Sequence, residues 1–337
     1  MDGAAGRAEY ADARHVRSRT ERISVRNAAL DRIDRSEEEG IGVRVRVGGA
    51  WGFAATRRVD RGGAEAALAR ALEVARSQPR ASDVPLAPES PARGSHRAGE
   101  GSDPFEVALE DKLEPLVAAE EALRGDPRVK VTRARFLAYA EEKTFASTEG
   151  SLCDQSRVEC GGGLEAVAVG DGESQVRSYP GSHGASVRQA GFEHFLALDL
   201  PGNAPGVADE VLALLSAPPC PAGPATVILD GEQVALQLHE SVGHATELDR
   251  VLGGEASYAG TSFLSPADAG SLRYGSPLMQ VTADATLPGG LGSFAWDDEG
   301  VAARSTPLVR DGVLAGFLSS RGSPHRRTII PRLYRVK

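Results

Sequence analysis

The 337-residue sequence predicts an α+β fold in several parts, with antiparallel sheets and covering helices. Short runs rich in Val and Ile alternate polar with apolar side chains, as half-buried strands do. Other runs place apolar residues at helical spacing, which predicts helices with one buried face. Turns rich in Gly and Pro separate these runs. At about 150 residues per domain, the length leaves room for two or three domains.

The first predicted domain covers residues 1–80. Alternating residues predict strands at 22–26 and 42–47, and Gly48-Gly49 makes a turn into a strand at 50–53;. Good helix formers follow from Ala64 to Arg76, with their apolar side chains on one face;. Residues 81–103 are rich in Pro, Gly and Ser without periodicity, so we expect a linker or surface loop there.

The second predicted domain covers residues 104–216 in an α+β arrangement. Asp103 is placed to cap a helix that begins behind Pro104;. Gly161-Gly162-Gly163 has neither the strand–loop–helix context nor the following Lys of a phosphate-binding loop, so we interpret it as a turn. The pattern also predicts strands at 129–131, 135–140, 166–169 and 193–199, and a helix at 206–215.

The third predicted region covers residues 217–320 and is β-rich after a first helix. Ala225 to Leu229 has the composition of a short buried strand, and Asp230 is a natural N-cap for a helix that runs to Gly253;. Asp311-Gly312 predicts a tight hairpin near the end, because both residue types accept positive φ. Residues 321–337 contain six basic residues and no acidic one, so this basic tail differs in composition from the region before it.

Composition excludes several classes of protein. The net charge of -9, from 47 acidic and 38 basic residues, disfavours broad binding of nucleic acid;. Three cysteines exclude a disulfide framework and favour a reducing compartment;. The sequence shows no signal peptide and no apolar run of the roughly 18 residues that a membrane helix needs. We therefore expect a soluble, cytoplasmic protein.

The chemistry is concentrated in a His-Glu-x-x-x-His pattern on the predicted helix that follows Asp230. His239 and His244 could be metal ligands, and Glu240 a general base, as in zinc proteases with the shorter His-Glu-x-x-His pattern;. Residues five apart on an α-helix point about 140° away from each other. Two ligands for one metal therefore require a local π-type turn, which Gly243 would permit. The alternative is an ordinary helix on which the three side chains have no common function.

Other residues of these types have weaker patterns. Cys153 and Cys160, with His183 and His194, lack the spacing of a zinc knuckle and fit ordinary thiols better. Cys220 lies between prolines, where a structural role is expected. The run Asp297-Asp298-Glu299 could supply a carboxylate ligand or shape a pocket for a cation, although such runs more often form a solvated turn. His325, in the basic tail, could replace a missing ligand only by accident.

Several segments resemble one known family in order from about residue 10 to residue 320. They include the His-Glu-x-x-x-His motif itself, Ser147-Thr148-Glu149-Gly150, and Leu287-Pro288-Gly289-Gly290 with the segment through 297–301. Further segments are 40–45, 49–53, 103–105, 112–113, 217–223 and 227–230. Together they are similar to the TldD/PmbA family of gyrase modulators and metallopeptidases. The motif marks the TldD-like branch, since the PmbA/TldE-like branch lacks it.

The resemblance implies a Zn²⁺-dependent peptidase that acts on short or unfolded peptides. His239 and His244 would bind the metal, and Glu240 would be the catalytic base. It also implies a dimer, often with a TldE/PmbA-like subunit, and no direct binding of nucleic acid or membrane is expected.

This chain departs from the family pattern at its C-terminal end. The resemblance implies that the third metal ligand of the family is a cysteine well downstream of the two histidines, whereas this chain has no cysteine after Cys220. We therefore expect an incomplete metallopeptidase region, truncated or frameshifted near residue 321. The alternative is a non-catalytic peptide-binding or partner subunit, or an inactive remnant.

Overall fold

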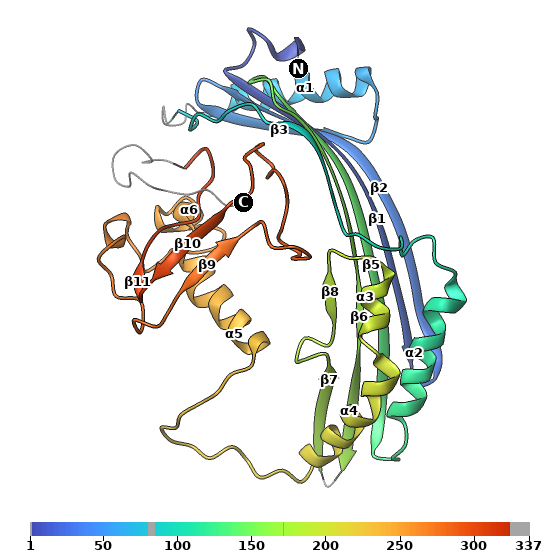
Figure 1. Ribbon diagram of the computed structural model, residues 1–337. Coiled ribbons are helices and arrows are strands. Elements are labelled where there is room, and N and C mark those ends of the chain that lie inside the picture. Colours follow the sequence, from blue (N-terminus) through green and yellow to red (C-terminus); the bar gives the residue numbers. More distant parts are fainter. Residues whose placement is uncertain (1, 80–84, 171, 324–337) are drawn as a thin grey trace.

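The computed structural model describes residues 2–79, 85–170 and 172–323. Its largest element is a long, curved sheet of eight strands in the order β3-β2-β1-β5-β6-β4, with β7 and β8 also paired to β6 (Figure 1). The pairing is antiparallel except between β4 and β6. The predicted α+β class with antiparallel sheets is confirmed. The strands are β1 (Tyr10–Arg26), β2 (Ala29–Val47), β3 (Ala50–Thr56), β4 (Arg93–Ala98), β5 (Val129–Ser147), β6 (Leu152–Gly170), β7 (Glu173–Tyr179) and β8 (Ser186–Arg188).

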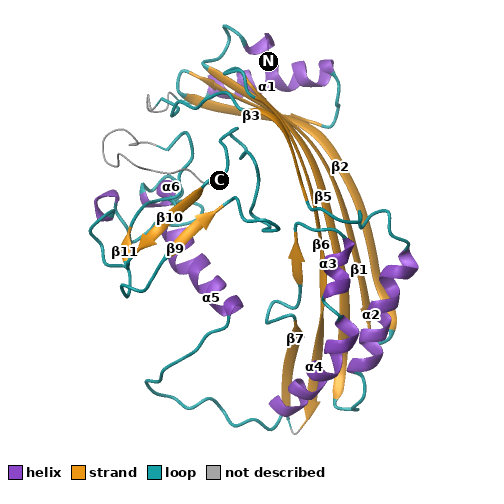
Figure 2. Ribbon diagram, viewed as in Figure 1, coloured by secondary structure: helices purple, strands orange, loops and turns teal. Residues whose placement is uncertain are grey.

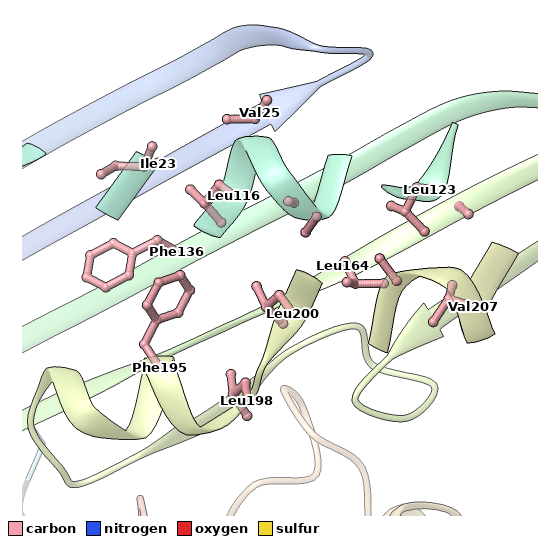
Figure 3. Packing of buried hydrophobic residues seen from close by; sticks show 14 of the residues in the cluster. Ile23, Val25, Leu116, Leu123, Phe136, Leu164, Phe195, Leu198, Leu200 and Val207 are labelled. Atoms are coloured by element: carbon pink, nitrogen blue, oxygen red, sulfur yellow. The ribbon is translucent and has the colours of Figure 1, made fainter. Parts of the chain in front are cut away.

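Helices cover one face of this sheet. The helices α2 (Leu109–Leu123), α3 (Phe192–Ala197) and α4 (Leu200–Leu214) pack over one end, and α1 (Arg61–Ser77) packs over the other. Figure 3 shows Phe136 of β5 beside Phe195 of α3, with ring centroids 5.0 Å apart in an edge-to-face arrangement. Leu116 of α2 and Leu200 of α4 are fully buried in the same cluster. Alternate strand residues point to opposite faces, so the other face is left for the rest of the chain.

Residues 217–323 lie on the concave side of the sheet (Figures 1 and 2). Gln155 of β6 bonds this region three times: its Nε2 donates to the Trp296 carbonyl at 2.8 Å, and its Oε1 accepts from the amides of Ala295 and Trp296 at 3.0 Å. Lys143 of β5 pairs with Asp298 at 2.7 Å. The region contains α5 (Gly231–Leu238), η2 (His239–Gly243), η3 (His244–Thr246), α6 (Leu248–Val251), η4 (Pro266–Asp268), and the small sheet of β9 (Val281–Asp284), β10 (Ser305–Arg310) and β11 (Val313–Leu314).

Several predicted elements are confirmed, with longer bounds. The helix predicted at 64–76 is α1, which begins earlier because the Asp60 carboxylate accepts a hydrogen bond from the Gly63 amide at 2.7 Å;. Asp311 and Gly312 both have positive φ, 50° and 75°, and join β10 to β11 as a tight hairpin;. The predicted strands from 22 to 53 and from 129 to 169 are parts of β1 to β3, β5 and β6.

Several predictions in the first two-thirds of the chain are wrong. The strand expected at 193–199 is α3 and its C-terminal turn, because Phe192 and Phe195 lie one helical turn apart and both face Phe136;. The expected glycine turn lies within β6. There, a Cβ on Gly161 would meet the Ser186 carbonyl oxygen at 1.9 Å, so glycine permits β8 to pair closely;.

The helix expected behind Asp103 begins only at Leu109. The Asp103 carboxylate instead accepts a hydrogen bond from the Phe105 amide at 2.9 Å, which closes a turn before the helix;.

The expected linker and the expected strand at 225–229 also differ from the structure. Residues 93–98 of the linker form β4, parallel to β6. Residues 225–229 pair with no described strand and are exposed, with Ile228 95% exposed. An apolar run predicts burial only where a partner strand lies next to it, and among the described residues none does.

The predicted basic tail begins at Arg321, which is buried and forms a two-pronged ion pair with Glu149 at 2.7 and 2.8 Å. Residues 324–337, with His325, lie outside the described residues.

Candidate metal centre

A short helix begins the site and changes its winding at the motif. The Asp230 carboxylate accepts a hydrogen bond from the Gln233 amide at 2.9 Å and caps α5, as predicted;. At its end the chain enters the π turn η2, where the His244 amide donates to the His239 carbonyl five residues earlier. The π turn required by the spacing of the two histidines is therefore confirmed. The single long helix predicted to Gly253 is replaced by α5, η2, η3 and α6.

The π turn brings the three predicted site residues together. The imidazole rings of His239 and His244 lie 4.5 Å apart between centroids, at 79° to each other. The Nε2 atom of His239 is 3.9 Å from a Glu240 carboxylate oxygen. One ligand atom from each residue falls within 4.8 Å of the others, and no other such group of three His, Cys, Asp or Glu side chains occurs among the described residues. The side chains of His239 and Glu240 are 61% and 62% exposed, so solvent and substrate can reach them.

Hydroxyl groups of later residues donate hydrogen bonds to three carbonyls of the turn. The Tyr274 hydroxyl donates to the Ser241 carbonyl, and Thr246 Oγ1 donates to the Val242 carbonyl at 2.8 Å and to the Gly243 carbonyl at 3.1 Å;. Gly243 has ordinary right-handed angles, and a Cβ there would lie 3.6 Å from the nearest atom. The turn is thus held by its side-chain partners, and the freedom of glycine is not required.

The donor set fits a zinc ion. Two imidazoles with a carboxylate beside them are the ligands and base that zinc peptidases use, and imidazole is a preferred zinc ligand. A catalytic zinc site has three protein ligands as a rule. The described cluster supplies two histidines and Glu240, and the sequence has no cysteine after Cys220.

The other predicted candidates lie apart from this cluster. Cys153 and Cys160 are buried thiols of β6, and burial raises the pKa of Cys160 to about 12, so the thiol stays protonated;. Cys220 is an exposed free thiol. His194 lies against Ser186 Oγ at 3.3 Å, and desolvation lowers its pKa. His183 is exposed in the turn before β8.

The acidic run 297–299 joins the two parts of the molecule. Asp297 is buried and accepts hydrogen bonds from the amides of Glu299 and Val301, both at 2.8 Å, and desolvation raises its pKa to about 6. Glu299 lies 3.5 Å from Arg44 of β2 and accepts from the Arg321 amide at 2.7 Å. The run therefore forms a turn that connects the C-terminal region to the sheet, and it does not belong to the cluster of His239, Glu240 and His244.

A cavity of about 980 Å³ lies between the concave face of the sheet and residues 293–298. Sequence reasoning proposed only that the run 297–299 could shape a pocket, and Asp297 and Asp298 are among the lining residues. Charged and aromatic side chains line it, and His239, Glu240 and His244 are not among its lining residues. The residues that line the cavity come from segments far apart in the sequence, so no local pattern could have predicted the cavity. Prominent lining residues are Arg14, Glu38, Phe53, Glu141, Lys143, Arg157, Phe294 and Trp296.

Three family models match the chain in order. Residues 11–77 match PmbA/TldA metallopeptidase domain 1, residues 102–216 match the central domain, and residues 222–328 match the C-terminal domain. The last match contains the π turn and both histidines, and it continues beyond Arg321.

Curated relatives carry the same description. A metalloprotease of Methanocaldococcus jannaschii is 27% identical over 326 residues, which are 94% of this chain and 67% of the relative. A metalloprotease of Methanothermobacter thermautotrophicus is 29% identical over 96% of this chain and 67% of its own length. The chain thus spans about two-thirds of the relatives it matches.

Solved structures share the fold at low identity. A protein of Bacteroides thetaiotaomicron named as a modulator of DNA gyrase has a TM-score of 0.78 at 18% identity, covering 99% of this chain and 73% of that one. TldE of Thermococcus kodakarensis has a TM-score of 0.69 at 17% identity, covering 96% and 72%. With family matches extending from residue 11 to residue 328, the chain belongs to the PmbA/TldD family of metallopeptidases.

Proposed function

We propose that this chain is a zinc-dependent peptidase of the TldD type that hydrolyses short or unfolded peptides. The observation that supports this most is the π turn, which brings the His239 and His244 rings together edge to face and leaves Glu240 beside them. The two imidazoles would hold the metal, and Glu240 would be the general base. An ordinary helix with no function for this motif would need neither the change of winding nor the hydroxyl partners of Ser241 and Val242.

The metal ion and Glu240 would contribute different parts of the reaction. A bound zinc ion would polarise the peptide carbonyl and lower the pKa of water at the site. Glu240 accepts the proton of the attacking water and returns it to the amine nitrogen as the C–N bond breaks. Its high exposure lets an extended peptide approach the carboxylate directly.

We also propose that the chain works as a dimer with a TldE/PmbA-like subunit in a reducing, cytoplasmic compartment. The similarity in fold to TldE of Thermococcus kodakarensis supports such a partner, and three free thiols suit that compartment;. No helix among the described residues has both the length and the apolar character needed to cross a membrane. Co-purification of a TldE-like protein from the source cell tests the pairing, and a chain that stays alone at all concentrations contradicts it.

The first experiment measures zinc in the purified chain. We expect near-stoichiometric zinc that is lost in His239→Ala, while the unfolding curves of the two proteins coincide when both are measured without metal. A folded, metal-free protein contradicts the proposal and supports the alternative, a peptide-binding subunit without catalysis.

The second experiment separates catalysis from metal binding. Glu240→Gln should keep its zinc and lose peptide hydrolysis by about 10²–10⁴-fold, the usual contribution of a positioned base. Glu255→Gln, a carboxamide change in the loop after α6, is the matched control. Equal hydrolysis by Glu240→Gln and the wild type would remove Glu240 from the mechanism.

A further inference from the structure

We propose that Glu247, held in place by Arg250, is the residue that positions His244 so that its Nε2 atom faces the metal. This rests on the proposed function, because it concerns one ligand of the same centre. Glu247 lies outside the His-Glu-x-x-x-His motif, and sequence reasoning gave it no role.

The contact with the ring defines its tautomer. A Glu247 carboxylate oxygen lies 3.0 Å from His244 Nδ1. An ionised carboxylate can only accept a hydrogen bond, so Nδ1 must donate and carry the proton. In the neutral ring the lone pair then lies on Nε2, which is the atom left for a metal. Histidine ligands generally donate their second ring nitrogen to such a partner, which fixes the ring and raises its basicity.

Arg250 fixes the carboxylate in turn. Its Nε donates to the second oxygen of Glu247 at 3.0 Å, and a terminal nitrogen donates to the Ala259 carbonyl at 2.6 Å. Its other terminal nitrogen lies 3.4 Å from His244 Nδ1, farther than the Glu247 oxygen, so the carboxylate makes the closer contact. The Arg250 side chain is 17% exposed and that of Glu247 29%, which favours one fixed geometry.

The backbone beneath Glu247 is also fixed. The residue forms a bridge to Leu318, whose amide donates to the Thr246 carbonyl at 2.8 Å, and the Leu248 amide donates back to the Leu318 carbonyl at 2.7 Å. Leu248 is buried in the small cluster that includes Phe317. The carboxylate therefore stands on rigid structure, and the His244 side chain, at 34% exposure, is more enclosed than that of His239.

The test uses the full chain and two independent readouts. In the metal-free protein, long-range proton–nitrogen NMR should show His244 as the Nδ1–H tautomer, its signals assigned by their loss in His244→Asn. In Glu247→Ala that preference should vanish, and zinc affinity should fall about 10–100-fold, the usual effect of removing such a partner. Glu247→Gln keeps the shape of the side chain, and its amide can donate to Nδ1, so it should also lose the preference. Glu255→Ala should change neither readout.

The outcomes separate this proposal from the proposed function. If the wild type binds zinc and Glu247→Ala and Glu247→Gln keep both the tautomer and the affinity, the positioning role is wrong and the peptidase proposal stands. If the wild type binds no zinc, both are wrong. Loss of affinity with equal denaturation midpoints of the metal-free proteins supports the positioning role, because a purely structural role would lower stability and leave the tautomer unchanged.

Discussion

Asp297 is buried and accepts two backbone hydrogen bonds, so its protonation should change the free energy of unfolding. Its pKa is raised to about 6 by desolvation, above the value of roughly 3.9 for an unfolded Asp. The folded chain therefore binds more protons than the unfolded chain between about pH 4 and pH 6. Over that window, this carboxyl should lower the free energy of unfolding as pH rises, by up to about 3 kcal/mol.

Asp297→Asn tests this at constant geometry, because the amide oxygen can still accept from the Glu299 and Val301 amides. The variant should gain stability over the wild type at pH 7 and lose the advantage at pH 4. Urea unfolding at both pH values measures the difference. A stability difference that is the same at pH 4 and pH 7 would contradict the raised pKa.

Gly243 provides a second test at the scale of one residue. Since its φ is ordinary and a Cβ has space, Gly243→Ala should keep zinc binding and stabilise the protein by about 0.5–1 kcal/mol. Thermal unfolding and zinc content measure both effects. Loss of zinc in this variant would mean that the π turn depends on glycine after all.

At this scale the sequence predicts the ligand pair and its geometry but not the residues around it. The five-residue spacing alone requires a π turn if His239 and His244 share a metal. Glu247 follows His244 by three residues, a spacing that makes contact possible but does not require it; Tyr274 is 33 residues from its partner Ser241. The role of Glu247 depends on the local winding of residues 244–250, whereas that of Tyr274 depends on a tertiary contact.

Among the elements, the π turn η2 depends on hydroxyl groups that lie after it in the chain. Thr246 is fully buried and its hydroxyl donates to the Val242 and Gly243 carbonyls. Thr246→Val keeps the shape and leaves these carbonyls without that donor. We expect a loss of about 1–3 kcal/mol in unfolding free energy and weaker zinc binding. Calorimetry and zinc titration measure the two losses, and an unchanged zinc affinity would show that the turn holds without this donor.

Helices and turns that depend on neighbouring residues can be predicted from the sequence, whereas elements that depend on distant segments cannot. Asp230 capping α5 and Asp311-Gly312 turning the hairpin are local, so the sequence predicts both. Residues 225–229 and β4 could not be predicted, because pairing with a distant strand decides whether an extended segment joins a sheet. The glycines in β6 likewise reflect close packing of β8, which is not apparent in the neighbouring sequence.

At the scale of the molecule, the C-terminal region is held to the sheet by neutral and charged contacts of different value. Gln155→Leu would leave the amides of Ala295 and Trp296 without their acceptor, so we expect the free energy of unfolding to fall by about 2–4 kcal/mol. Hydrogen exchange of residues 295–301 should rise in the same variant.

Asp298→Asn is the comparison for that experiment. The Asp298 side chain is 64% exposed opposite Lys143, and such pairs contribute less than about 1 kcal/mol. A larger effect for Asp298→Asn than for Gln155→Leu would mean that charge dominates the docking.

The sequence predicts a separate region from residue 217, but the side of the sheet that this region occupies was not predictable. Alternation shows that a strand has two faces, but not which face the helices cover. Side-chain packing decides this: Phe136 packs against α3 on one face, and Phe145 lies against Gly300 on the other.

The exposed stretch from 216 to 230 has a consequence for the integrity of the chain. It is exposed throughout and crosses from α4 to α5, which makes it the kind of segment that proteases cut first. Gln155, Lys143 and Glu149 bind the region after residue 230. A single cut in the stretch should therefore yield two pieces that elute together in size-exclusion chromatography and separate only in denaturant. The same gene could then be divided at this point and expressed as two polypeptides that reassemble into the same fold.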